Sequence, residues 1–214
     1  MTTELIAFLD ESRKPTRNPK TGRVREPERY YYVVAAAVVI DGDSPNIRHQ
    51  LGQVETEIAY PLHYRNLSTT RRVEALEAID RIDGWDGYLY ETVRPLPEAG
   101  YSEHHVRAKL VAEALTHLNS EGVVEAVLET RAGTKTDFQP LDDKDYQVLR
   151  KLQRQRVVPN SFRISHGDKA ETILQIADLL AGARSDWLCE VNREAHARIG
   201  HRVHTIRTVF NKTP

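Results

Sequence analysis

The chain has 214 residues, of which 40% are apolar, and this length and composition predict one domain with one hydrophobic core. Its 30 basic and 31 acidic side chains leave a formal charge of −1, which excludes attraction to nucleic acid or to a membrane by bulk charge, so any contact with a polyanion must be local. A single cysteine excludes an internal disulfide and a cysteine-clustered zinc site, and no apolar run has membrane length, so we expect a soluble, cytoplasmic protein.

The first predicted element is a short apolar run, residues 5–9, that stops at two carboxylates, Asp10 and Glu11, in the stretch LIAFLDES. Its length is typical of a strand buried on both faces. Side chains alternate along a strand, so Asp10 and Glu11 should point to opposite faces. We therefore expect Asp10 alone to be central in a site at this strand end. The alternative is a polar turn that follows a core strand.

Residues 13–29 form a basic segment with seven Lys or Arg side chains, three prolines and one glycine. This composition predicts a long loop without a packed element. A loop of this kind can contact the phosphates of a nucleic acid, and it can equally be a solvated connection. The candidate phosphate contacts are Arg13, Lys14, Arg17 and Lys20.

The next segment, residues 30–40, is the clearest predicted strand, because it has aromatic and β-branched ends and no breaker. We expect it to pair antiparallel with the first strand. The elements expected after it are helices at about 46–58 and 68–82, a strand at 86–94, a helix at 102–119, a strand at 123–130, a polar helix at 143–155, a short strand at 161–165, a helix at 169–188 and a basic tail at 192–214.

Asp178 lies in the last predicted helix, in the sequence QIADLLAGA. Helical spacing places it beside Leu174, Ala181 and Gly182, so its carboxylate has an apolar setting and needs a metal ion, an arginine or a backbone donor as a partner. The small residues should let this helix approach the sheet closely. The alternative is that Asp178 lies at the stripe edge, where it reaches solvent or bonds a loop.

Two further acids, Asp168 and Glu171, have the spacing of a capping box before the last helix, which is a sufficient structural explanation for both. His63 could lie at a site, but a lone histidine in a loop is more typical of a structural or exposed side chain.

The motifs FLDES (8–12) and QIADLLAGA (175–183), at opposite ends of the chain, are similar to the two signature motifs of the family called domain of unknown function 3800, which belongs to the ribonuclease H-like group. The resemblance implies a single α/β domain over residues 1–214. Its mixed five-stranded sheet would have three antiparallel strands and then alternating helix and strand, with helices on both faces and a helical insertion at about 46–83. The chain departs from the family at Arg13, where the family usually has glycine.

The resemblance also implies a set of metal ligands at the ends of the first and fourth strands and on the last helix: Asp10, Glu129 and Asp178. Glu11 would assist as a ligand or base, and Glu113 or Glu103 is a candidate for the acid of the first core helix. Oxygen ligands suit Mg²⁺ or Mn²⁺, and phosphodiester cleavage with such ions needs several converging carboxylates. We therefore expect the three acids to meet at one end of the sheet.

These observations favour a metal-dependent nuclease or a related phosphodiester-processing hydrolase. One alternative is a non-catalytic nucleic-acid or protein-binding module on the same scaffold, such as an accessory component of a defence or mobile-element system. Another is a small-molecule phosphohydrolase with a closed pocket. The choice between DNA and RNA, and between endonuclease and exonuclease, stays open. A homodimer stays open too, if the 30–40 strand or the late helix is exposed.

Overall fold

The computed structural model describes residues 3–16, 18, 21, 23–24, 29–59, 61–93, 96, 102–130, 141–168 and 170–210. Its centre is a six-stranded mixed sheet with the order β5-β4-β1-β2-β3-β6. Strands β1, β2 and β3 are antiparallel, β4 and β5 run parallel to β1, and β6 runs parallel to β3. The strands are β1 (Leu5–Pro15), β2 (Tyr30–Ile40), β3 (Trp85–Thr92), β4 (Val123–Glu129), β5 (Arg163–Gly167) and β6 (Val203–Thr208).

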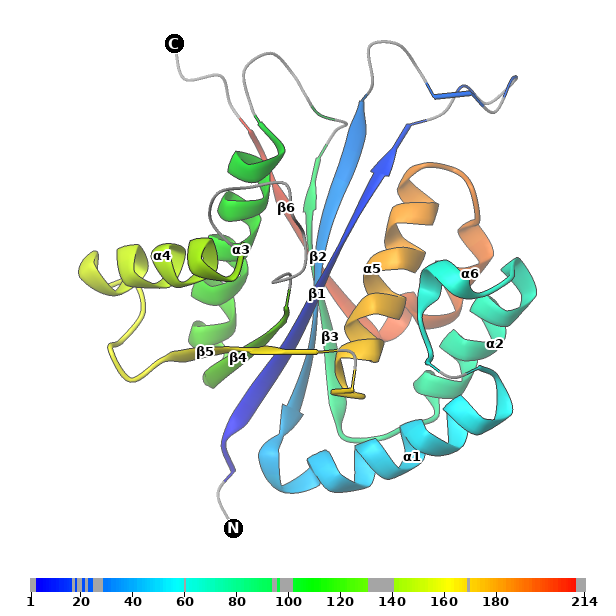
Figure 1. Cartoon of the computed structure of the whole chain (residues 1–214), viewed down its shortest axis with the longest axis horizontal. Coiled ribbons are helices and arrows are strands. Elements are labelled where there is room, and N and C mark those ends of the chain that lie inside the picture. The colour runs from blue at the N-terminus through cyan, green and yellow to red at the C-terminus, as the bar shows by residue number, and fades with distance from the viewer. Residues whose placement is uncertain are drawn as a thin grey trace.

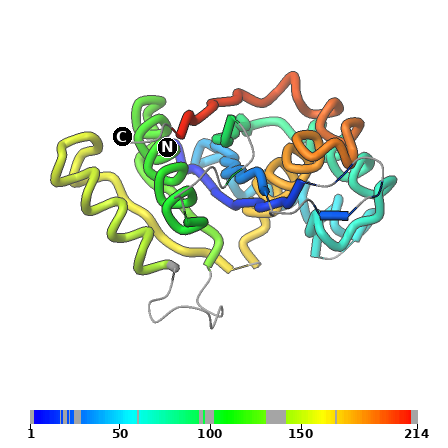
Figure 2. The backbone as a smooth tube through the Cα atoms, turned by 90° about the horizontal axis from the view of Figure 1, so that it is seen from above, coloured from blue at the N-terminus to red at the C-terminus, as the bar shows by residue number. Residues whose placement is uncertain are grey.

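Helices cover both faces of this sheet (Figures 1 and 2). One face carries α3 (Glu103–Ser120) and α4 (Leu141–Arg154), and the other carries α1 (Ser44–Glu57), α2 (Thr69–Asp80), α5 (Leu174–Leu188) and α6 (Arg193–Ile199). Short 3₁₀ turns occur at Asp41–Asp43, Tyr64–Asn66 and Gly200–Arg202.

The sheet separates two hydrophobic cores, and strand alternation decides which side chain enters which core. In β2, Val33 and Ala35 belong to the core under α5, whereas Val34 and Ala36 belong to the core under α3. A strand that is apolar at nearly every position is therefore explained by burial on both faces.

Strand β4 is shorter than β1, so β1 has no pairing partner on the β4 side from Asp10 onward. The parallel register ends with Leu9 opposite Leu128, whereas β1 continues to Pro15 with β2 as its partner. Glu129, the last residue of β4, therefore lies at the level of Asp10. The carboxyl end of a parallel strand, where sites gather in α/β sheets, coincides here with an acid on each of two neighbouring strands.

The expected ribonuclease H-like arrangement is confirmed by strand order and direction, with one difference. The sheet has six strands instead of five, because the basic tail contributes β6 at the edge beside β3. Most side chains of β6 are exposed or half-buried, so this strand lacks the apolar run that identified the others. Its pairing depends on the exposed edge of β3, which is a tertiary feature.

The expectation that all of residues 13–29 lie in a loop is wrong at its start. Arg13 to Pro15 belong to β1 and pair with the first residues of β2. The proline ends the ladder, where its missing N–H group leaves no hydrogen bond unmade. Beyond it, the Thr16 amide still donates to the Arg29 carbonyl at 2.7 Å, which holds the two chain segments together.

The last core helix begins at Leu174, later than the predicted start at residue 169. The capping explanation for its acids is correspondingly wrong. Asp168 accepts a hydrogen bond from the Ala170 amide, and Glu171 forms an ion pair with Arg48, with both of its oxygens at 3.1 Å. These bonds stabilise turns that precede the helix.

The two apolar surfaces considered for a homodimer are covered within the chain. Strand β2 lies between β1 and β3, and most of α5 is buried against the sheet. Among the described residues, no helix combines the length and the apolar character needed to span a membrane.

Candidate metal-binding site

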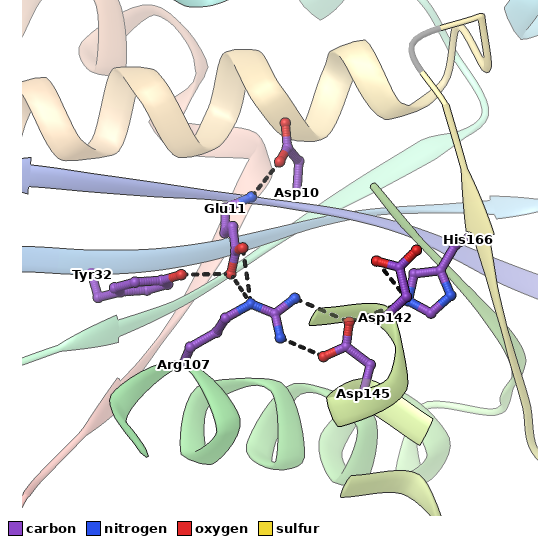
Figure 3. A network of polar contacts seen from close by, with 7 residues as sticks. All are labelled: Asp10, Glu11, Tyr32, Arg107, Asp142, Asp145 and His166. Carbon is purple, nitrogen blue, oxygen red and sulfur yellow. Dashed lines mark hydrogen bonds and ion pairs between the residues drawn. The ribbon is translucent and has the colours of Figure 1, made fainter. Parts of the chain in front are cut away.

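Asp10 and Glu11 point to opposite faces of β1, as the alternation of the strand predicted. Figure 3 shows Asp10 directed toward α5 and Glu11 directed toward α3. The neighbours agree, because Phe8 belongs to the core under α5 and Leu9 to the core under α3. The two adjacent acids therefore serve two different environments.

The structure brings Asp10, Glu129 and Asp178 together at one cavity on the α5 side. The cavity has a volume of about 20 Å³, and its lining consists of these acids with Pro61, Leu62, His63, Glu171, Leu174 and Gln175. This space is about that of one water molecule or ion. Asp10 and Asp178 thus lie on the same side of the sheet, which was the condition that the proposed carboxylate site had to meet.

Asp10 is the buried member of this group, with 6% of its surface exposed. Burial raises its pKa well above the usual value, and the nearby carboxylates of Asp178 and Glu129 raise it further. The Glu11 amide donates to Asp10 Oδ1 at 2.6 Å and opposes this shift without cancelling it. The cavity therefore concentrates negative charge in a place where water screens it poorly, which is the electrostatic setting that a cation would stabilise.

Asp178 is oriented by the loop that precedes α2. Its Oδ2 atom accepts a hydrogen bond from the Tyr64 amide at 2.6 Å and lies 2.8 Å from Nδ1 of His63. Both contacts use the same oxygen, so Oδ1 is left for a ligand in the cavity. The two sequence interpretations of Asp178 are therefore both realised: it bonds a loop, and it lines the site.

Gly182, one turn after Asp178, makes this loop contact sterically feasible. A Cβ atom at Gly182 would lie 2.9 Å from Tyr64 Cβ and closer still to the tyrosine ring. At this position the small residue admits the tyrosine of the loop, while α5 itself packs on β1 and β2 as the small residues of the motif predicted. The Tyr64 hydroxyl in turn donates to the buried Asp186 at 2.8 Å, and burial raises the pKa of Tyr64 to about 12.

Sequence reasoning assigned His63 and Glu171 structural roles, yet both line the cavity. His63 follows Pro61 and Leu62 in the loop, and no spacing to another ligand marked it. Glu171 is part of the lining while it also pairs with Arg48. The sequence alone does not indicate that either residue lies near Asp10, because this proximity depends on how α1 and the loop after it pack against α5.

On the opposite face, Glu11 takes part in a buried polar network (Figure 3). Its carboxylate accepts hydrogen bonds from the Tyr32 hydroxyl at 2.7 Å and from Arg107 Nε at 2.9 Å. Arg107 also binds both carboxylate oxygens of Asp145. Glu11 was considered as a ligand or base, but its carboxylate already accepts these structural hydrogen bonds.

The network continues from Asp145 to His166 and Asp142. Burial alone would raise the pKa of Asp145, but the hydrogen bonds from His166 and Arg107 lower it. Burial would lower the pKa of Arg107, but the charges of Glu11 and Asp145 raise it. Among the described residues, Asp142, Asp145 and His166 form the group of at least three side chains whose ligand atoms all lie within 4.8 Å of one another.

The acids proposed for the first core helix lie elsewhere. Glu113 accepts a hydrogen bond from Thr208 of β6, and Glu103 pairs with Arg13 at 2.8 Å. Neither lines the cavity that holds Asp10. The α3 side chain beside the acids is instead Arg107, which borders a second small cavity together with Asp10, Glu11 and Glu129.

The predicted phosphate contacts have different positions. Arg13 stacks over the Tyr30 ring, with 4.4 Å from its Cζ atom to the ring centroid, in addition to its pairing with Glu103, and Lys14 forms an ion pair with Asp186. Arg17 and Lys20 lie outside the described residues. Both described cations are therefore engaged within the chain.

A larger cavity of about 970 Å³ lies at the carboxyl end of α4, and its lining includes Arg150, Arg154 and Arg156. It contains none of the acids considered above. We place the candidate site at the smaller cavity, because converging carboxylates define metal chemistry and volume alone does not.

Comparisons with known proteins give little further detail. No protein-family model matches the chain, and no curated protein matches it. A crystal structure of a mutant protein of Bst-RNase HIII is similar in structure, with a TM-score of 0.48 and 16% sequence identity over 92% of this chain and 56% of that one. This chain thus spans little more than half the length of that protein. Membership of the family that the two motifs suggested stays a prediction.

Proposed function

We propose that the protein is a divalent-metal-dependent hydrolase of phosphodiesters, with a nucleic acid as its substrate. The observation that carries this proposal is the convergence of Asp10, Glu129 and Asp178, from β1, β4 and α5, on one ion-sized cavity. Burial raises the pKa of Asp10, and the nearby carboxylates of Asp178 and Glu129 raise it further. Three oxygen donors with an excess of negative charge fit a hard cation such as Mg²⁺ or Mn²⁺.

In this proposal the chain's own residues hold and orient the reacting groups. Asp10, Glu129 and Asp178 would bind the cation, which supplies Lewis-acid activation of a phosphoryl oxygen and of the attacking water. The Glu11 amide fixes the Asp10 carboxylate, and the Tyr64 amide fixes that of Asp178. Such anchored ligands are held in place before substrate arrives, which is what positioning contributes to catalysis.

The size of the cavity constrains where a substrate would lie. A space of about 20 Å³ holds an ion but no nucleotide. A phosphodiester would therefore approach from outside and place only its oxygen atoms against the acids.

The test is cleavage of labelled single-stranded and double-stranded DNA and RNA in the presence of Mg²⁺ or Mn²⁺. Asp10→Asn and Asp178→Asn should each lower the rate at least ~100-fold, because each removes a charged ligand. Asp86→Asn is the matched control, since Asp86 is an exposed carboxylate on β3 and should leave the rate unchanged.

Activity that survives both substitutions would reject the assignment. Salt-sensitive binding of nucleic acid without cleavage, and without stabilisation by Mn²⁺, would instead support the binding module considered from the sequence.

A further inference from the structure

The polar network on the α3 and α4 face ends in a group with mixed nitrogen and oxygen donors. Nε2 of His166 lies 3.2 Å from Asp145 Oδ2 and 3.9 Å from Asp142 Oδ1. Asp145 and His166 are nearly inaccessible, with 1% and 8% of their side-chain surfaces exposed. Figure 3 shows the three side chains directed toward one another from α4 and β5.

The spacing of these atoms matches a coordination shell. Zn²⁺ binds imidazole nitrogen and carboxylate oxygen at about 2.0–2.1 Å, so two ligands of a tetrahedral site lie about 3.3 Å apart. The separations of 3.2 and 3.9 Å between His166 and the two aspartates fall close to this value. Small side-chain rotations would bring all three atoms to bonding distance of one ion.

Outer contacts already orient both carboxylates. Thr130 Oγ1 donates to Asp142 Oδ2 at 2.7 Å, which leaves Asp142 Oδ1 facing the histidine. Arg107 donates to both oxygens of Asp145, including Oδ2, which also faces His166. Hydrogen bonds that fix the ligands from outside are characteristic of metal sites, in which such partners set ligand orientation.

We propose that Asp142, Asp145 and His166 bind one divalent transition-metal ion of the Zn²⁺ class. The nitrogen donor distinguishes this site from the all-oxygen cavity around Asp10, because imidazole suits Zn²⁺ and Co²⁺ whereas carboxylates alone suit Mg²⁺. The two aspartates lie in the first two turns of α4, and His166 lies near the end of β5. The ion therefore joins α4 to the sheet. The site is separate from the proposed hydrolytic site and does not depend on it.

The test uses the full chain, freed of metal with a chelator and titrated with Zn²⁺ in a calorimeter and with Co²⁺ by visible absorption. The wild type should bind one equivalent at this site and give the Co²⁺ bands of a site with a nitrogen ligand. His166→Gln should lower the affinity at least ~100-fold, and Thr130→Val about 10-fold or more, because the first removes a ligand and the second removes its support.

Two controls separate this site from other metal-binding groups. His201→Gln removes an imidazole with 66% of its side chain exposed and should leave binding unchanged. Asp178→Asn removes a ligand of the other cavity and should leave the Co²⁺ spectrum of the nitrogen-containing site intact. Loss of nuclease activity in Asp178→Asn with this spectrum retained would show the two sites to be independent.

A Co²⁺ spectrum of a nitrogen-containing site that persists in His166→Gln, or no Zn²⁺ binding by the wild type, would overturn the proposal and leave a hydrogen-bonded triad only. Circular dichroism in the presence of chelator establishes that each variant is folded. If His166→Gln does not fold, Asp142→Asn takes its place, since Asp142 is the more exposed ligand.

Discussion

Asp10 combines three features: it is buried, it directly follows the last pair of the parallel β1–β4 register, and two other acids lie near it. Its raised pKa means that the folded chain favours the protonated form. The stabilising contribution of Asp10 is therefore fully present below the unfolded-state pKa of about 3.9, and it is lost as the pH rises through the higher folded-state value.

This linkage predicts the effect of Asp10→Asn in the presence of chelator. The amide keeps an acceptor for the Glu11 N–H group and removes the charge. The variant should become increasingly more stable than the wild type as the pH rises from about 4 toward neutrality, by about 1.4 kcal/mol for each unit by which the pKa is raised. Urea unfolding at a series of pH values measures the difference.

Two additions make this measurement specific. Asp86→Asn should show no such trend, because its carboxylate is exposed. Saturating Mg²⁺ or Mn²⁺ should reduce or reverse the advantage of Asp10→Asn, since a bound cation stabilises the charged wild type. A stability difference that is constant with pH would contradict the role assigned to the neighbouring acids.

Gly182 offers a second test at the residue scale, because it has a matched glycine elsewhere. Gly182→Ala forces a methyl group against Tyr64 and should cost about 1–3 kcal/mol of unfolding free energy. It should also lower the cleavage rate, since the Tyr64 amide orients Asp178.

Gly52 in α1 is the control, because no atom lies within 4 Å of the position that its Cβ would occupy. Gly52→Ala should raise stability by about 0.5–1 kcal/mol and leave activity unchanged. Equal effects of the two substitutions would show that Tyr64 does not depend on the small residue. Thermal unfolding and a cleavage assay on both variants decide the matter.

At the scale of elements, the sequence predicted those whose own residues carry the pattern. The strand Tyr30–Ile40 was predicted with its observed bounds, and the helix Glu103–Ser120 within one residue at each end, because unbroken apolar runs and a serine cap identify them. Strand β6 and helix α6 were missed. Their side chains are largely polar, and their positions depend on the edge of β3 and on contacts with α2 and α5.

The same distinction, between residues marked by the pattern of their own element and residues placed by contacts between elements, applies to the site. Asp10, Glu129 and Asp178 could be selected because each ends a strand or interrupts an apolar helix face. Arg107 could not, because it meets Glu11 across 96 positions of sequence and only after α3 packs on the sheet. Spacing within an element is readable from sequence, whereas contacts between elements on opposite faces are not.

The junction of α5 and α6 provides a prediction at the element scale. His196 on α6 has Nε2 2.9 Å from an Arg184 nitrogen, and burial together with the charge of Arg184 lowers its pKa from 6.5 to about 4. For a base with a lowered pKa, stability is present above the unfolded-state value and is lost as the pH falls toward the folded-state one. Between pH 6.5 and about 4, this residue should cost roughly 3 kcal/mol of stability.

His196→Gln removes this titration and retains a polar side chain beside Arg184. The variant should lose less stability than the wild type over the same acidic range. Denaturant unfolding from pH 7 to 4 measures both proteins. If stability falls equally with pH in the wild type and in His196→Gln, groups other than His196 cause the acid sensitivity.

At the scale of the whole molecule, a formal charge of −1 means that nucleic-acid binding must come from a local group of cations. The basic segment 13–29 is the predicted group, and its four candidate phosphate contacts divide into two pairs. Arg13 and Lys14 form ion pairs with Glu103 and Asp186. Arg17 and Lys20 lie outside the described residues, and their contact with phosphates stays a prediction.

Substitution of either pair removes two positive charges, but the expected effects on nucleic-acid binding differ. Arg17→Gln with Lys20→Gln should weaken binding to duplex DNA and reduce the slope of log affinity against log salt by about 1.8, the release of counterions from two phosphate contacts. Fluorescence anisotropy over a range of salt concentrations measures the slope.

Arg13→Gln with Lys14→Gln is the matched control within the same segment. Because Lys14 is one of two cations, with Arg72, that pair with the buried Asp186, this variant should lose about 1–3 kcal/mol of stability. Its salt slope should stay that of the wild type, since neither side chain is available to phosphate while it is paired. If the slope instead fell in this variant and not in the Arg17 and Lys20 variant, strand β1 itself would be the nucleic-acid contact, and the ion pairs with Glu103 and Asp186 would have to open for binding.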